Sequence, residues 1–155
     1  MNLRLARPSE SEELSALAIT AKALWGYSPQ QLAGWANQLR ISQESIATVP
    51  TFVVEEHGRL VGVAQLSQES TRWAIECLWV HPSSIRRGVG KRLLQHVLAY
   101  ARSHGQTELR VDADPNAEAF YLRLGARRVG EVAAPVLGQP RRIRPQLVVS
   151  TENAA

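Results

Sequence analysis

Two neighbouring segments decide how this chain folds: Glu76-Cys77-Leu78-Trp79-Val80-His81-Pro82 and Arg86-Arg87-Gly88-Val89-Gly90-Lys91. Together they predict a β-strand that ends at a proline, a glycine-containing loop, and a helix that begins at the second glycine. The first amides of a helix have no intrahelical acceptors and carry partial positive charge. Because glycines let an anion approach these amides closely, the segments predict a binding site for a pyrophosphate-bearing cofactor.

Two well-known phosphate-binding patterns do not fit this loop. The P-loop pattern G-x-x-x-x-G-K-[ST] fails because only Val89 separates Gly88 from Gly90. The dinucleotide-binding pattern requires a third glycine, where this chain has Leu93. The loop instead resembles the acetyl-CoA loop of the GCN5-related N-acetyltransferases (the GNAT family), written [QR]-x-x-G-x-[GA]. Gly88 and Gly90 occupy the two small positions, and Ile85 replaces the leading Gln or Arg.

A second block carries the same resemblance. The segment Asp114-Pro115-Asn116-Ala117-Glu118-Ala119-Phe120-Tyr121-Leu122-Arg123-Leu124-Gly125-Ala126 is similar to the family motif N-x-A-x-x-F-Y-x-x-x-G-[FA]. Its most specific part is Phe120-Tyr121 with Gly125 four residues after the tyrosine. A buried aromatic pair is more often core than site, but its position one strand after the glycine loop favours a site. Asn116 is equally well suited to cap a helix.

The resemblance implies a role for each matched residue. The glycine loop holds the pyrophosphate, and the end of the preceding strand holds the pantetheine together with Asn116 and polarises the thioester carbonyl. Tyr121, with an ordinary pKa near ~10, stays protonated at neutral pH and protonates the leaving thiolate. The predicted cofactor-binding residues are Leu78, Trp79, Val80, Arg86, Arg87, Gly88, Val89, Gly90, Lys91 and Asn116.

The catalytic base is predicted from its position on the strand. Glu76 lies two residues before Leu78 and is the first candidate, acting directly or through a water; a solvated strand glutamate is an equal alternative. Some relatives have a glutamate base in the strand before the asparagine, but Arg110 occupies that place here and Asp112 is a weaker substitute. Cys77 has no paired histidine and is more typical of a core residue than of a nucleophile.

Apolar periodicity and turn residues predict the remaining elements. The first helix is expected to begin with a capping box, Ser9 to Glu12, and the second at Ser28-Pro29. Strands are predicted over 3–6, 51–56, 60–68, 73–80, 108–112, 126–133 and 143–150, and helices over about 9–24, 28–40, 90–104 and 116–124, with a short helical piece after residue 42. This order predicts an α/β (α+β) fold: one domain over residues 1–155, with a mixed sheet of about seven strands flanked by about four helices. The order also matches the GNAT fold, so the resemblance covers essentially the whole chain.

Composition and charge narrow the class of protein. No apolar run approaches the ~20 residues of a membrane span, the N-terminus lacks a signal-peptide pattern, and a single cysteine suits a reducing compartment. We therefore expect a cytoplasmic protein without a membrane partner. The four histidines have no metal-ligand spacing, so no metal is expected. Residues 76–155 hold 12 basic and 7 acidic side chains, an excess that an anionic cofactor largely explains.

The sequence thus predicts an acetyl-CoA-dependent N-acetyltransferase that moves an acetyl group directly to a primary amine of a small molecule or protein. One alternative is a non-catalytic acyl-CoA-binding sensor on the same fold. A basic nucleic-acid-binding module ranks last, since no aromatic residues alternate with the basic cluster. Exposed strand edges of such folds often pair between subunits, which leaves a homodimer open.

The resemblance also suggests where the acceptor amine binds, without identifying it. In the resembling fold the first two helices and a late loop form opposite walls of the acceptor cleft. Aromatic residues flank the first wall and arginines lie on the second, where a solvated loop is slightly favoured over an acceptor-binding role. These candidates are Trp25, Tyr27, Trp35, Arg141, Arg142 and Arg144.

Overall fold

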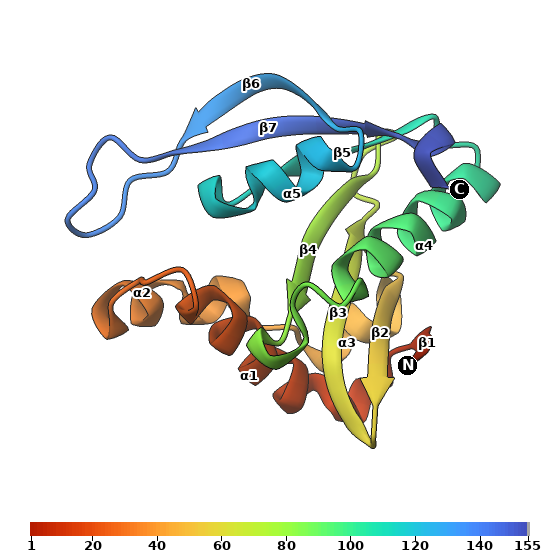
Figure 1. Ribbon diagram of the computed structural model, residues 1–155, viewed down its shortest axis with the longest axis horizontal. Coiled ribbons are helices and arrows are strands. Elements are labelled where there is room, and N and C mark those ends of the chain that lie inside the picture. Colours follow the sequence, from red (N-terminus) through yellow and green to blue (C-terminus); the bar gives the residue numbers. More distant parts are fainter. Residues whose placement is uncertain (155) are drawn as a thin grey trace.

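The computed structural model, which describes residues 1–154, has one seven-stranded sheet at its centre, with the strand order β1-β2-β3-β4-β5-β7-β6 (Figure 1). Neighbouring strands are antiparallel except for β4 and β5, which are parallel. The mixed α/β sheet predicted from the sequence is therefore confirmed. The strands are β1 (Asn2–Leu5), β2 (Thr51–Glu56), β3 (Arg59–Ser67), β4 (Ala74–Val80), β5 (Glu108–Asp112), β6 (Arg127–Ala133) and β7 (Ile143–Ser150).

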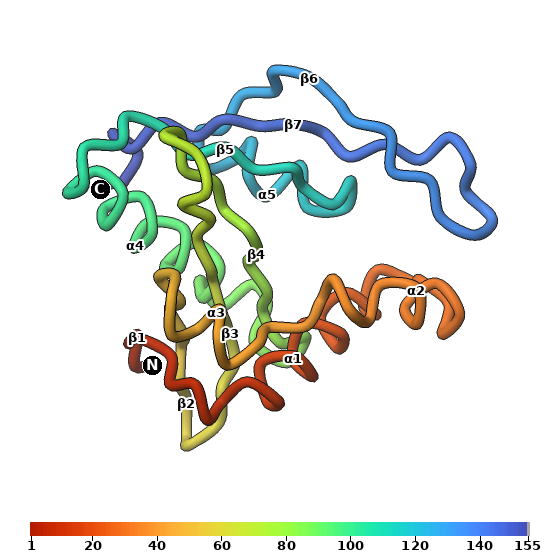
Figure 2. Tube along the Cα trace, turned by 180° about the vertical axis from the view of Figure 1, so that it is seen from behind, coloured from red at the N-terminus to blue at the C-terminus, as the bar shows by residue number. Residues whose placement is uncertain are grey.

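Five α-helices accompany the sheet in residues 1–154: α1 (Ser11–Ala23), α2 (Pro29–Leu39), α3 (Gln43–Thr48), α4 (Val89–Ser103) and α5 (Glu118–Arg123). The sequence predicted about four helices and a short helical piece after residue 42, and this piece is α3. Figure 2 shows α1 and α2 near the C-terminal end of β4, in the lower part of the view, while β6, β7 and α5 lie in the upper part. None of these helices has the length and apolar character needed to cross a membrane.

The two faces of the sheet bury separate apolar clusters, because successive strand residues point to opposite sides. On β2, Phe52 and Val54 belong to the cluster that contains α4, whereas Val53 belongs to the cluster that contains α1 and α3. On β4, Leu78 packs toward α4 and Trp79 toward α1. The strand that precedes the glycine loop thus presents one side to each layer of helices.

The two predicted helix starts have different outcomes. At α2 the prediction is confirmed: the Ser28 hydroxyl accepts a hydrogen bond from Gln31 N (3.1 Å), and the first helical residue is proline. At α1 the predicted capping box is wrong, because Pro8–Glu10 form a 3-10 turn that includes Ser9 and delays the helix to Ser11. There the Glu10 carboxylate accepts from the backbone amide of Arg7 (2.8 Å).

The sheet divides between β4 and β5. These strands pair at one register position, Ala74 opposite Arg110, and then diverge toward their C-terminal ends. β4 is also irregular beside β3: Gln65 lies opposite Cys77 and Leu66 opposite Ile75, so Glu76 is an extra, bulged residue. The divergence leaves the β5-facing edge of β4 without a neighbouring strand along most of its length.

Candidate functional site

A cavity of about 740 Å³ occupies the space where β4 and β5 diverge. Residues of α1, α2, β3, β4, β5 and β7 line it, so it is enclosed by both helical and strand walls. Leu78, Trp79 and Tyr121 are on its wall, whereas the glycine loop at 86–91 is outside it. The predicted site residues therefore fall into two groups, one around the cavity and one at the start of α4.

α4 begins at Val89, one residue before the predicted start at Gly90. Gly88 is the N-cap residue with φ +83°, a left-handed conformation that favours glycine. The first backbone hydrogen bond of the helix runs from Arg92 N to Gly88 O (3.0 Å). The amides of Val89, Gly90 and Lys91 therefore have no intrahelical acceptor and can bind an anion.

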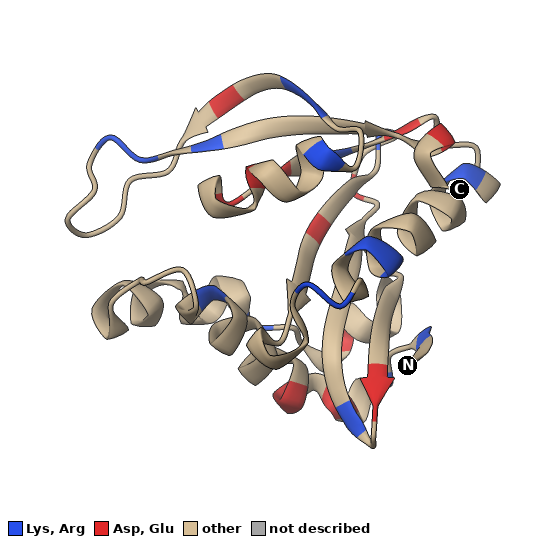
Figure 3. Cartoon of the chain, viewed as in Figure 1, with Lys and Arg blue, Asp and Glu red and all other residues tan. Residues whose placement is uncertain are grey.

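Lys and Arg residues are concentrated in the loop before α4 and in its first turn (Figure 3). Arg87 Nη1 pairs with Glu56 Oε1 at 2.6 Å, and Arg92 Nη1 donates to the backbone oxygen of Met1. Arg86 has a positive φ of 63°, which makes the backbone before the helix unusual. Arg86, Lys91 and Arg92 form no ion pair with the described residues, so their charge is available to a phosphate.

Gly90 is required for packing as well as for anion approach. A Cβ atom at this position would lie 3.0 Å from Cε1 of Phe120 and 3.5 Å from Cγ2 of Val80. The glycine loop and the Phe120-Tyr121 segment, which are 30 residues apart in sequence, are thus in direct contact. Val80, predicted to contact the cofactor, packs at this junction and does not line the cavity.

Tyr121 is buried and lines the cavity next to β4. Burial raises the pKa of its hydroxyl above the ordinary value, and the neighbouring Cys77 adds to the rise. The hydroxyl therefore remains protonated across the whole range of working pH. Burial likewise raises the pKa of the Cys77 thiol to about 12, with the charge of Glu76 contributing, so Cys77 is a poor nucleophile at neutral pH.

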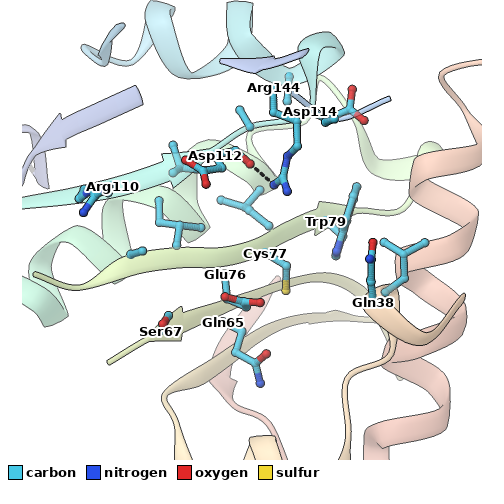
Figure 4. A pocket seen from close by; sticks show the side chains of 18 of the residues that line it. Gln38, Gln65, Ser67, Glu76, Cys77, Trp79, Arg110, Asp112, Asp114 and Arg144 are labelled. Carbon is cyan, nitrogen blue, oxygen red and sulfur yellow. Dashed lines mark hydrogen bonds between the residues drawn. The ribbon is translucent and has the colours of Figure 1, made fainter. Parts of the chain in front are cut away.

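Glu76 lines the same cavity from β4 and is exposed to it. It is the bulged residue between Ile75 and Cys77. Figure 4 shows Glu76 and Cys77 adjacent on β4, with Asp112 and Arg144 on the other side of the gap. Arg144 donates to the backbone oxygen of Asp112, which joins the ends of β7 and β5.

The structure reveals a polar cluster around Asp114 that the sequence did not predict. Its Oδ2 atom accepts hydrogen bonds from Lys22 Nζ (3.2 Å), Tyr27 OH (2.9 Å) and Arg142 Nη2 (3.0 Å). Its Oδ1 atom accepts from the backbone amide (2.8 Å) and side-chain amide (2.9 Å) of Asn116. Burial opposes ionisation of Asp114, but these hydrogen bonds and the charge of Lys22 outweigh it and lower its pKa. We call these five residues the Asp114 cluster.

Two site predictions change because of the Asp114 cluster. Asn116 does not line the cavity: its side chain is bonded to Asp114 and Tyr27, and Asp114 itself caps the 3-10 turn Pro115–Ala117. The helix-cap alternative for Asn116 is therefore wrong. Arg142 is not a solvated loop residue, since its side chain is only 5% exposed, whereas Arg141 is exposed.

Lys22 has a contact pattern that is unusual for a lysine. Its side chain is only 9% exposed and its ammonium nitrogen lies 3.9 Å from the ring centroid of Trp35. Burial lowers its pKa, an effect larger than the opposing influence of Asp114. In sequence, Lys22 lies four residues after Ala18, on the apolar face of α1. This spacing could have predicted that Lys22 is buried.

Comparison with known proteins identifies the family. Residues 18–126 match the model of the acetyltransferase (GNAT) family. The chain belongs to the GNAT acetyltransferase family. It is 31% identical over 134 residues to YafP of Escherichia coli strain K12, which is described as an uncharacterized N-acetyltransferase, and the match covers 83% of each protein. The resemblance stated from the glycine loop and the Phe-Tyr block is thus confirmed.

Solved structures with this fold are similar over almost the whole chain. A GCN5-related N-acetyltransferase from Rhodopseudomonas palustris has a TM-score of 0.79 at 23% identity, covering 96% of this chain and 94% of that one. The PaiA N-acetyltransferase of Thermoplasma acidophilum, solved in complex with coenzyme A, has a TM-score of 0.79 at 16% identity and covers 96% and 98%. These structures confirm the predicted GNAT fold. The acetyltransferase class is confirmed by the family match and by the similarity to YafP.

Proposed function

We propose that this GNAT protein transfers the acetyl group of acetyl-CoA directly to a primary amine bound in the cavity. One observation carries the proposal: the edge of β4 that lacks a strand partner lies beside a cavity walled by Glu76, Cys77 and Tyr121, and β4 ends shortly before the free amides of α4. A thioester donor and an amine must meet in one place, and the gap between β4 and β5 gives both access to the same strand edge.

The donor end of the gap is suited to coenzyme A. The amides of Val89, Gly90 and Lys91 are available to a pyrophosphate, and Arg86 and Lys91 supply positive charge. The unpaired edge of β4 around Leu78 to Val80 offers backbone groups to an extended pantetheine arm. That PaiA N-acetyltransferase, with the same fold, was crystallised with coenzyme A supports this placement.

The reaction requires two proton transfers. The amine loses a proton, its nitrogen attacks the thioester carbonyl, the carbon–sulfur bond breaks, and the coenzyme A thiolate takes up a proton. We assign the first transfer to Glu76, directly or through a water, and the second to Tyr121. A backbone amide near Leu78 would stabilise the negative charge on the carbonyl oxygen.

Calorimetric titration of the protein with acetyl-CoA, ATP and NAD tests the donor assignment. Stoichiometric, micromolar binding of acetyl-CoA alone is expected, followed by amine-dependent release of free thiol. Absence of acetyl-CoA binding would refute the proposal. Tight binding without turnover of any amine in a broad panel would favour the acyl-CoA sensor instead.

A further inference from the structure

The Asp114 cluster carries more positive than negative charge in a buried place. Lys22 and Arg142 are both cationic, and Asp114 is the single carboxylate that they share. The two oxygens of Asp114 already accept from five donor atoms, so its capacity to accept hydrogen bonds is used up. Buried charges are ordinarily balanced by a partner, and this cluster lacks one negative charge among the described residues.

Lys22 retains donor capacity toward the cavity. An ammonium has three N–H groups; one is directed to Asp114 and the ring face of Trp35 lies against the same nitrogen. Lys22 is nevertheless part of the cavity wall. A ligand oxygen in the cavity would therefore meet an ammonium that is held by Asp114 and surrounded by the rings of Tyr27, Trp35 and Trp79, with N–H groups that have no hydrogen-bond acceptor among the described residues.

Arg142, which shares Asp114 with Lys22, has a donor atom without a partner. Its Nη1 atom donates to the backbone oxygen of Ala134, and its Nη2 atom donates to Tyr27 and Asp114. Its Nε atom is fully buried and has no hydrogen-bond partner among the described residues. Such an orphaned donor in a cationic environment is costly, and an anion nearby would offset part of that cost.

The surrounding walls indicate the rest of the ligand. The rings of Trp25 and Trp79 lie 5.9 Å apart and both line the cavity, as does Trp35, so a flat or apolar body can pack there. The strand walls carry the carboxylates of Glu76 and Asp112, which suit an amine. The cavity thus offers the cations Lys22 and Arg142 near its α1 end, and on its strands the carboxylates of Glu76 and Asp112 beside the cations Arg110 and Arg144.

We propose that the acceptor is a small amine that also carries a carboxylate, such as an apolar or aromatic amino acid, and that Lys22 binds this carboxylate with Arg142 behind it. The proposal rests on the assignment of the cavity as the acceptor site. It names the chemical class of the acceptor, which family membership leaves open.

The test compares ligands that differ only in charge. Free protein is titrated by calorimetry with 3-phenylpropanoate and with its neutral amide, and then with indole-3-propanoate and its amide. None of these compounds has an amine, so binding is measured without acetyl-CoA or turnover. Each carboxylate is expected to bind about tenfold more tightly than its amide, or better, because a hydrogen bond to a charged group is worth more than one to a neutral group.

Two charge-neutralising variants locate the preference. Lys22→Gln retains a side chain that can donate to Asp114 and should abolish the difference between carboxylate and amide. Arg102→Gln removes one positive charge from an exposed position in the last turn of α4 and should preserve it. Circular dichroism and thermal unfolding verify that both variants are folded.

Three results would overturn the proposal: no binding of either carboxylate, equal binding of carboxylate and amide, or a preference that survives in Lys22→Gln. The wild-type comparison alone is decisive if Lys22→Gln does not fold. Because acetyl-CoA is absent from these titrations, failure of the carboxylate site is distinguishable from failure of the donor assignment.

Discussion

The ring of Phe120 lies against the α-carbon of Gly90, so close that a methyl group on Gly90 would stand 3.0 Å from its Cε1 atom. Two sequence motifs that suggest different parts of one cofactor site are therefore also a single packing unit. A change in either motif is transmitted to the other by contact.

We predict that Gly90→Ala destabilises the protein by about 1 kcal/mol, because overpacking against Phe120 outweighs the better helix propensity of alanine. Urea unfolding measures the change. In a Phe120→Leu background the ring is absent, so the same substitution should become neutral or stabilising. Identical effects in both backgrounds would show that the contact is not energetically significant.

Gly88→Glu should abolish acetyl-CoA binding, measured by calorimetry, because it introduces negative charge and a side chain at the N-terminus of α4. The substitution also strains a left-handed residue, φ +83°, by about 1–2 kcal/mol. Gly88→Asn is the matched control, since asparagine tolerates this conformation and adds no charge. Unchanged affinity in Gly88→Glu would exclude the loop from the phosphate site.

Tyr121→Phe should lower kcat by about 10²-fold or more while leaving acetyl-CoA affinity nearly unchanged, because only proton donation is lost. Burial raises the pKa of Tyr121, so wild-type turnover should show no loss of this acid between pH 7 and about pH 10. Steady-state thiol release over this range makes both measurements. Full activity of the variant would remove Tyr121 from the mechanism.

Glu76→Gln should flatten the acidic limb of the pH–rate profile, since protonation of the base would no longer limit the rate at low pH. Glu69→Gln is a suitable control because Glu69 is an exposed carboxylate on the wall of the same cavity. Its profile should match the wild type. If the two variants behave alike, Glu76 is a solvated strand residue.

Asp114→Asn should cost about 3–5 kcal/mol of stability at neutral pH, because it leaves two buried cations without a counter-charge. The pKa of Asp114 is lowered by folding, so its contribution is present above the unfolded-state value of about 4 and lost as pH falls through the folded value. Thermal unfolding from pH 7 to pH 3 should show the two proteins converging in acid. A constant difference would contradict the ionised state of Asp114.

Local signals predicted the elements of this fold closely. The strands at 51–56, 108–112 and 143–150 have their predicted bounds, because turn residues or breakers flank each apolar run. The predicted start of α1 was wrong because Pro8 begins a 3-10 turn before the helix, and Glu10 accepts from the Arg7 amide at that turn. Local patterns thus predict well which segments form strands and helices, and predict poorly where a helix begins when several capping residues lie close together.

The Asp114 cluster escaped prediction because its contacts are remote in sequence. Lys22 and Asp114 are 92 residues apart, and Arg142 lies 28 residues beyond Asp114. No local pattern pairs such residues; only the fold brings α1, the end of β5 and the β6–β7 loop together. The glycine loop was predictable because its chemistry depends on consecutive backbone groups.

The single register pair between β4 and β5 has a mechanical consequence. Beyond Ala74 and Arg110, no backbone hydrogen bonds of the sheet join β4 to β5. Ion pairs connect the two sides of this opening instead. Asp114 lies just after the end of β5, and its cationic partners are Lys22 of α1 and Arg142 of the β6–β7 loop. The width of the opening between β4 and β5 therefore depends on ion pairs to Asp114. These ion pairs are lost when Asp114 is protonated in acid, whereas the backbone hydrogen bonds of a continuous sheet do not titrate.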